Sequence, residues 1–422
     1  MKGDVYMFII NAILDLGAVV MLPILIFVLS LVFGEKPGKA LRAGITIGIG
    51  FIGINLVIGL LSSSLGPAAE ALVKNSGLQL DVIDVGWPAA AAIAFASRVG
   101  ALVIPIGLAV NIIMLVTRIT KTVNVDLWNY WHFAFTGALV SAATGSLPLG
   151  MIAAAINAAI VLKLGDWTAP LVQEFYGLPG ISLPHGFSLA YVPIAIPLNK
   201  LFDKIPGINK IDVNPDNISE KFGVLGEPTM VGLILGIVLG LIAKYDIKDS
   251  LNLGMSMAGV MFLMPRMVRI LMEGLIPVSE AAKKFMQKRF AGNEFYIGLD
   301  SAVAIGHPSA IATALILVPI TILLALIVPG NRVLPFGDLA TIPFMVAMVA
   351  PICRGNVFRS VIIGALVIAV GLLIATNVAP LHTQAAIDAA FQFPEGATSI
   401  SSICDGANPL TWVLLKIMQL FG

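Results

Sequence analysis

Charged side chains are scarce in this sequence. Only 12% of its 422 residues are Asp, Glu, Lys or Arg, whereas soluble domains carry about 25%. Hydrophobic residues make up 58% of the chain, and the mean hydropathy is +0.97. Runs such as 7–33, 224–243 and 310–328 approach or exceed the length of about 20 residues that an α-helix needs to cross a bilayer. We therefore predict an all-α, polytopic membrane protein.

Several other features are missing, and each absence excludes a class of function. Cys353 and Cys404 are the only cysteines, too few and too far apart to predict a disulfide framework or a metal site. The sequence contains neither a GxxxxGK[ST] phosphate loop nor an HExxH zinc motif, so a nucleotide-driven pump is not expected. A net charge of +1 argues against a nucleic-acid partner. We expect no cofactor, no metal and no catalytic residue legible from spacing.

The two halves of the chain match at an offset of 210 residues. PAAEALVK at 67–74 corresponds to PVSEAAKK at 277–284, GWP at 86–88 to GHP at 306–308, and DLW at 126–128 to DLA at 338–340. This order of matches predicts repeats at 10–164 and 222–376. A connecting segment, 165–221, joins them, and a tail with a last helix follows at 377–422.

Charges in the connecting loops predict that the repeats are inverted. Loop 34–42 has net charge +2 and its counterpart 244–249 has zero, whereas loop 66–84 has −2 and its counterpart 276–294 has +2. Because Lys and Arg concentrate in short cytoplasmic loops, equivalent loops are expected on opposite sides of the membrane.

Inversion requires an odd number of crossings in each repeat. We therefore expect re-entrant hairpins near 86–97 and 298–312, and a non-spanning segment at 185–198. The total is about eleven transmembrane helices, with the N-terminus outside and a last helix at about 408–421 that brings the C-terminus inside. The acidic residues Asp388, Glu395 and Asp405 place the tail before that helix on the outside.

Polar residues within apolar segments indicate the functional site, because they are costly there unless they face a cavity or a partner. Asn111 and Asn157 are best explained as hydrogen bonds between helices. Seven other residues are candidate substrate contacts: Asn55, Trp87, His132, His185, Glu227, Asp300 and His307. Trp87 and His307 occupy the two hairpin tips. Carboxylate, imidazole and amide groups with an indole ring, and no committed Arg or Lys, are typical of a site for a neutral polyhydroxylated ligand.

The segments VIDVGWPAAAAIAFASR, NYWHFAFTGALV and GLDSAVAIGHPSA resemble the ascorbate–galactitol superfamily of phosphotransferase-system IIC components. The galactitol-specific IIC permeases are the most similar branch. This resemblance covers nearly the whole chain. It implies a homodimeric protein of the bacterial inner membrane that moves its substrate by an elevator mechanism. It also implies a cytoplasmic IIB partner that phosphorylates the polyol or sugar, and IIA, which supplies phosphate to IIB.

Three departures from the ascorbate branch bear on the substrate. That branch has a Thr-Tyr pair where this chain has Gly86 and Trp87, a Gln where it has Thr136, and a Gln where it has Gly186. The resemblance therefore implies a neutral alditol, such as galactitol, in place of ascorbate.

Two other classes of function share the same composition. An ion-coupled secondary transporter would use Asp300 or Glu227 as proton carrier, and a membrane-embedded enzyme would turn over its substrate unaided. The repeat pattern alone does not separate the first of these from a group-translocating permease.

Overall fold

The computed structural model describes residues 17–76, 80–215, 220, 223–289, 294–335, 337–393 and 397–421. These residues are mostly helical, as the sequence predicts. The longer helices are α2 (Gly17–Val32), α3 (Pro37–Ser76), α4 (Gly86–Ala96), α5 (Gly100–Val116), α6 (Trp131–Thr144), α7 (Leu147–Tyr176), α9 (Val192–Phe202), α11 (Pro228–Ile242), α12 (Ile247–Arg289), α13 (Pro308–Ile327), α16 (Val357–Asp388) and α17 (Pro409–Met418). The short helices are η1 (Trp128–Tyr130), α8 (Gly186–Leu189), η2 (Ile208–Lys210), η3 (Gly223–Gly226), η4 (Ser301–Val303), η5 (Leu339–Thr341), α14 (Ile342–Val346), α15 (Val349–Ile352) and η6 (Asp405–Ala407).

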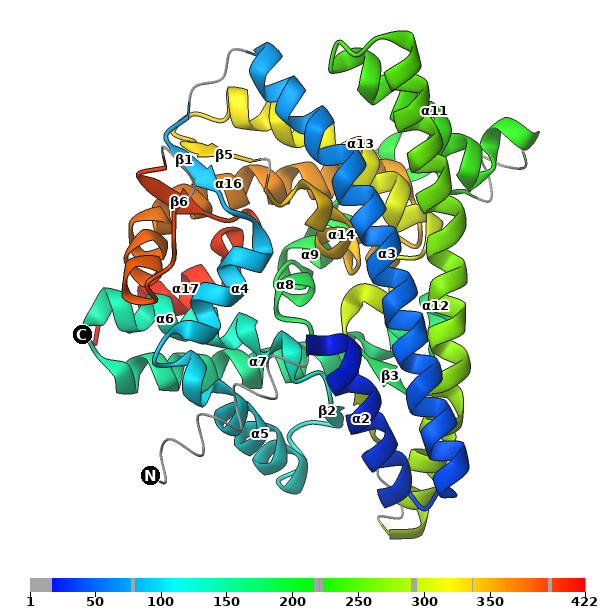
Figure 1. The fold of residues 1–422 in the computed structure, drawn as a ribbon, viewed down its shortest axis with the longest axis vertical. Helices are drawn as coiled ribbons and strands as arrows, with labels where there is room; N and C mark the ends of the chain where they lie inside the picture. Colours follow the sequence, from blue (N-terminus) through cyan, green and yellow to red (C-terminus); the bar gives the residue numbers. More distant parts are fainter. Residues whose placement is uncertain are drawn as a thin grey trace.

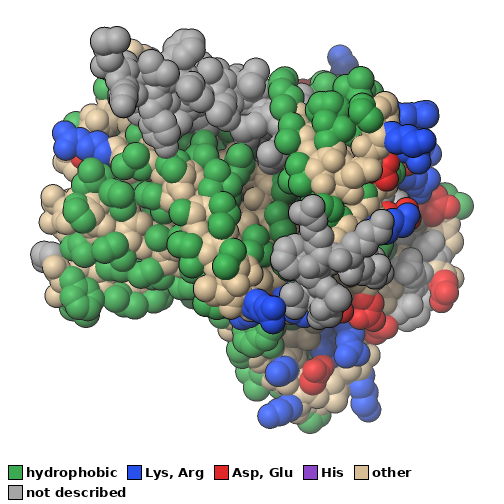
Figure 2. Space-filling model, turned by 90° about the horizontal axis from the view of Figure 1, so that it is seen from below, with side chains coloured by type: hydrophobic (Ala, Val, Ile, Leu, Met, Phe, Trp, Pro, Cys, Tyr) green, Lys and Arg blue, Asp and Glu red, His purple; other side chains and the backbone are tan. Residues whose placement is uncertain are grey.

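Five of the described helices, α3, α7, α12, α13 and α16, are long and apolar enough to cross a membrane. The pair α4 and α5 bends by 87° at its junction and forms either a broken sixth span or a re-entrant turn. Figure 2 shows a broad hydrophobic surface on one side of the molecule, with Lys, Arg, Asp and Glu gathered toward the opposite margins. The chain is therefore a multi-pass membrane protein, whereas the expected total of about eleven spans stays a prediction.

Four helices, α2, α3, α11 and α12, form a group that we call the four-helix group. They contact one another more extensively than they contact the rest of the chain, and α3 and α12 run side by side along the long axis (Figure 1). A Cβ atom at Gly50 would lie 2.6 Å from Cβ of Leu271, and one at Gly274 would lie 2.7 Å from Cγ1 of Ile47. These contacts make the two helices antiparallel, and the glycines permit their close approach.

Two small parallel sheets join the halves of the chain. One has the order β5 (Val333–Leu334), β1 (Val82–Asp84), β6 (Ser399–Ser401), and the other has the order β2 (Thr122–Asn124), β4 (Tyr296–Gly298), β3 (Ile181–Ser182). In each sheet the central strand comes from one half and both edge strands from the other. Val82 pairs with Val333 in the first sheet, and Thr122 pairs with Tyr296 in the second.

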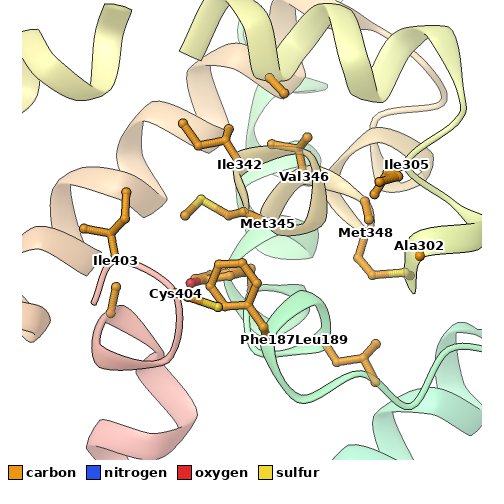
Figure 3. Packing of buried hydrophobic residues seen from close by; sticks show 14 of the residues in the cluster. Phe187, Leu189, Ala302, Ile305, Ile342, Met345, Val346, Met348, Ile403 and Cys404 are labelled. Atoms are coloured by element: carbon orange, nitrogen blue, oxygen red, sulfur yellow. The ribbon is translucent and has the colours of Figure 1, made fainter. Parts of the chain in front are cut away.

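The buried core lies where the strand ends and short helices of both halves meet. Figure 3 shows Phe187 from α8, Met345 from α14 and Cys404 from the loop after β6 converging, with Ala302 nearby on η4. Phe187 is 0% exposed and Met345 is 2% exposed. This packed cluster gives the neighbouring polar side chains a rigid support.

Two expected boundaries are wrong. The segments 67–74 and 277–284, expected in connecting loops, are helical and belong to α3 and α12. The helix α16 continues to Asp388, so the first part of the expected tail is helical. Charge placed both segments in loops, but their helical pattern continues the adjoining spans.

Candidate functional site: a buried polar cavity

A cavity of about 230 Å³ opens beside this core. Its walls come from α3, α4, η1, α6, α8, η4, η5, α14 and the loop before η6. The lining residues are Asn55, Ile58, Trp87, Trp128, Asn129, Trp131, His132, His185, Phe187, Asp300, Ala302, Thr341, Phe344 and Cys404. Both halves of the chain therefore contribute to one site.

The structure brings five of the seven candidate residues together in this cavity: Asn55, Trp87, His132, His185 and Asp300. The other two lie elsewhere. Glu227 is an exposed residue at the start of α11. His307 is the N-cap of α13, where its Nδ1 accepts from the Ser309 amide at 3.2 Å, and its ring packs against Phe175, with the ring centroids 4.3 Å apart.

Trp87 is held at the start of α4 by its backbone. Its N–H donates to Oδ1 of Asp338 at 2.5 Å. Gly86 precedes it with φ = 80°, a left-handed conformation that glycine adopts without a Cβ clash, and a Cβ atom there would lie 3.1 Å from the Gly337 carbonyl oxygen. The glycine in GWP is thus required by the turn that presents the indole.

Asp300 is presented by the turn that follows β4. Its Oδ1 accepts from the Ala302 amide at 2.8 Å and caps η4. The same oxygen lies 3.7 Å from Nε2 of His185, and the side chain is 17% exposed. Asp300 therefore has a fixed orientation and keeps an accessible oxygen at the cavity wall.

His132 and His185 form the polar centre of the site. Their Nε2 atoms are 3.3 Å apart, and Nδ1 of His132 lies 2.5 Å from Oδ2 of Asp405. Asp405 is fully buried, so its expected place in an exposed acidic tail is wrong. A buried imidazole provides the hydrogen bond that makes burial of this carboxylate tolerable.

Sequence reasoning missed several lining residues. Asn129 and Thr341 each lie three positions after the paired aspartates Asp126 and Asp338, and this shared spacing was a usable signal. Asn129 donates to Oδ2 of Asp126 at 2.5 Å. Other lining residues, among them Phe187, carry no polar pattern that sets them apart in a sequence that is apolar throughout.

The asparagines assigned to structural hydrogen bonds have that role. Asn157 donates to the Thr136 hydroxyl at 2.5 Å and joins α7 to α6. Asn111 donates to the Thr122 carbonyl oxygen at 2.8 Å and accepts from the Asn124 amide, which ties α5 to β2.

The lining combines aromatic surface with uncharged and acidic polar groups. Three of the chain's five tryptophans, Trp87, Trp128 and Trp131, line the cavity. No Lys or Arg is among its lining residues in the part of the chain that the structure describes. Such a site provides hydrogen-bond acceptors and donors for hydroxyl groups and ring faces for C–H surfaces. It is poorly suited to a compact anion.

Comparisons with known proteins agree with this chemistry. Residues 12–396 match the family model described as PTS system sugar-specific permease component. The chain is 47% identical over 407 residues to the PTS system galactitol-specific EIIC component of Escherichia coli (strain K12), covering 96% of this chain and 90% of that protein. It is 43% identical over 408 residues to a putative permease IIC component of the same strain, covering 97% of this chain and 93% of that protein. The resemblance noted from the sequence is confirmed.

Proposed function

The chain belongs to the sugar-specific permease components of the phosphotransferase system, and from this premise we propose that its central cavity binds galactitol. The chain is a sugar-alcohol permease of that system, as its relatives indicate. The observation that carries the substrate assignment is the cavity lining, which has three indoles, two imidazoles and a carboxylate, and no basic side chain among its described residues. A neutral alditol offers many hydroxyls and no charge, and it matches this set of groups.

The partners follow from the family. A cytoplasmic IIB protein phosphorylates the bound polyol, and IIA supplies the phosphate to IIB. The chain itself acts as the transport subunit, and its cavity residues bind and orient the substrate without forming a covalent bond to phosphate. We place the protein in the bacterial inner membrane with its N-terminus outside and its C-terminus inside.

Inverted repeats are part of the proposal, and the packing supports them. The equivalent helices α3 and α12 are antiparallel. The two sheets have reciprocal composition, since β1 lies between strands of the second half and β4 between strands of the first. Left-handed residues also recur near equivalent helix ends: Gly34 and Lys244, Arg118 and Gly330, Gly177 and Ala390.

A reciprocal pair of ion pairs supports the same symmetry. Arg332, just before β5, pairs with Asp81, just before β1. Lys121, just before β2, pairs at 3.0 Å with Glu294, shortly before β4. Each pair thus joins the two halves at corresponding positions, as two inverted repeats around one axis require.

An elevator movement and a homodimer complete the proposal. Asn55 and Ile58 reach the cavity from α3 of the four-helix group, whereas the other lining residues belong to the rest of the chain. A substrate site at such a boundary changes its exposure when one body slides past the other. Exposed apolar side chains on α3, such as Ile45, Ile49 and Leu56, provide a surface for lipid or for a second copy.

The alternative function is an ion-coupled secondary transporter. Asp300 lies in the cavity and is the better placed of its two expected proton carriers, because Glu227 is exposed outside it. The two functions differ in their need for IIA and IIB.

Galactitol binding by the purified chain tests the substrate assignment. Because three of five tryptophans line the cavity, binding should change the indole fluorescence, and calorimetry should give a saturable isotherm. Substituting Phe for Trp87 should reduce the fluorescence change, whereas the same substitution at Trp167, which is 73% exposed, should not. If galactitol produces neither signal, the substrate assignment is wrong.

A further inference from the structure

The hydrogen-bond partners of His132 determine which ring nitrogen carries its proton. Oδ2 of Asp405 lies 2.5 Å from Nδ1. Oδ1 of Asp405 accepts from the Asn408 amide at 3.2 Å, so both carboxylate oxygens face donors, and a carboxylate only accepts. The proton of a neutral His132 is therefore on Nδ1, and its Nε2 is an acceptor at the cavity wall.

His185 has the opposite tautomer. The Ser188 backbone amide, which can only donate, faces Nδ1 of His185 at 3.3 Å, and the Ser188 hydroxyl donates its proton to the Phe344 carbonyl oxygen at 2.7 Å. Nε2 of His185 faces two acceptors, Nε2 of His132 at 3.3 Å and Oδ1 of Asp300 at 3.7 Å. The proton of His185 is thus on Nε2, where it donates into the cavity.

We propose that Asp405 is a positioning residue, which holds the proton of His132 on Nδ1 so that His132 and His185 present an acceptor and a donor side by side to a vicinal diol of the substrate. This inference depends on the proposed sugar-alcohol function. The two Nε2 atoms are 3.3 Å apart, close to the length of a hydrogen bond, and the two oxygens of a gauche vicinal diol have a similar separation. One hydroxyl donates to His132, and its neighbour accepts from His185.

This arrangement selects for hydroxyl groups. A carbonyl or carboxylate oxygen has no proton to give to Nε2 of His132, and it would leave that buried acceptor without a partner. Sites built to hydrogen-bond a substrate hydroxyl reject analogues that lack it, because buried polar groups are then unpaired. Asp300 adds a further acceptor beside the pair, which again favours a ligand with several hydroxyl donors.

Asp405 acts on the ligand only through His132, and the surrounding groups determine what an amide would do in its place. The side-chain oxygen of Asn408 accepts from two backbone amides at the start of α17, and its amide nitrogen donates to the Gly186 carbonyl oxygen at 3.1 Å and to Asp405. In Asp405→Asn, the new amide oxygen therefore faces Asn408, and the new NH₂ group faces Nδ1 of His132. His132 then moves its proton to Nε2, and two N–H donors face each other.

The test measures tautomers and affinity on the full-length chain in detergent. Nitrogen NMR of histidine-labelled protein, assigned by substituting His132 and His185 in turn, should show Nδ1–H for His132 and Nε2–H for His185. Asp405→Asn should move the His132 proton to Nε2 and weaken galactitol binding by between about tenfold and a hundredfold. Asp84→Asn is the matched control, because Asp84 is a buried carboxylate that accepts from the Gly86 and Asp338 amides, and it should change neither result.

Monodeoxygalactitols test the diol directly. Removing one hydroxyl of the bound diol should weaken binding to the unmodified chain roughly tenfold, and it should add little further loss in Asp405→Asn. A purely structural role for Asp405 predicts instead a lower melting temperature, an unchanged His132 tautomer and the same deoxy penalty in both proteins.

Three results overturn the proposal: Nε2–H for His132 in the unmodified chain, unchanged galactitol affinity in Asp405→Asn, or equal deoxy penalties in the two proteins. If the tautomers are as assigned but galactitol does not bind to the unmodified chain, the substrate assignment and the diol fail together. The tautomer change in Asp405→Asn then still measures the positioning role on its own.

Discussion

Replacing Asp300 by Asn should weaken galactitol binding by between about tenfold and a hundredfold. The carboxylate faces the cavity with 17% of its side chain exposed, and it accepts hydrogen bonds with a full negative charge. Loss of a charge-assisted hydrogen bond to a ligand costs about 1.5–3 kcal/mol, and each 1.4 kcal/mol corresponds to a factor of about ten in affinity.

The substitution leaves the local fold intact. The Asn side-chain oxygen can still accept from the Ala302 amide, so the cap of η4 persists. The matched control is Glu70→Gln, which removes the charge of an exposed carboxylate on α3 that does not line the cavity. Calorimetric titration of both variants with galactitol provides the comparison. Equal affinities in the two variants would remove Asp300 from the site and refute the reasoning.

The remaining predictions concern the hairpin tip, the helix ends and the repeat symmetry. His307→Ala should lower the melting temperature by the loss of an N-cap, worth about 1 kcal/mol, with and without galactitol alike; a marked loss of affinity at unchanged stability would give His307 the ligand role expected from the sequence. Gly177→Ala, at φ = 65°, should lower the free energy of unfolding by about 1 kcal/mol, whereas Gly59→Ala, inside α3 with open space around it, should raise it by about 0.5–1 kcal/mol; the reverse order in thermal melts would contradict this. Single cysteines at Lys39 and Lys248, both exposed, should react with membrane-impermeant reagents from opposite sides once the native cysteines are replaced, and labelling of both from one side would disprove inversion.

Sequence patterns predicted the elements of this fold well, because apolar length and turn residues are local properties. The helices expected near 99–116 and 128–145 correspond to α5 and α6. The GSLPLG break also falls at the end of α6, where Gly145 has φ = 65°. Boundaries were less reliable where charge was the guide, since helices such as α12 continue into polar sequence beyond an apolar span.

The candidate site was predicted in part for a similar reason. Ionisable and aromatic residues in apolar surroundings are conspicuous, so the sequence alone singles out His132, His185 and Asp300. It does not indicate the partner of His132, because Asp405 lies 273 positions away, and no local pattern distinguishes a buried carboxylate from a solvated one. His307 shows the opposite case, in which a conspicuous residue caps a helix beside the site.

Transport in membrane vesicles tests the central claim most directly. Vesicles that contain this chain, loaded with IIA, IIB, the general phosphotransferase proteins and phosphoenolpyruvate, are given labelled galactitol. A phosphotransferase permease predicts that the label accumulates inside only as galactitol phosphate, and only when IIB is present. Accumulation of unmodified galactitol driven by a proton or sodium gradient, without IIA and IIB, would contradict the account and establish the ion-coupled alternative.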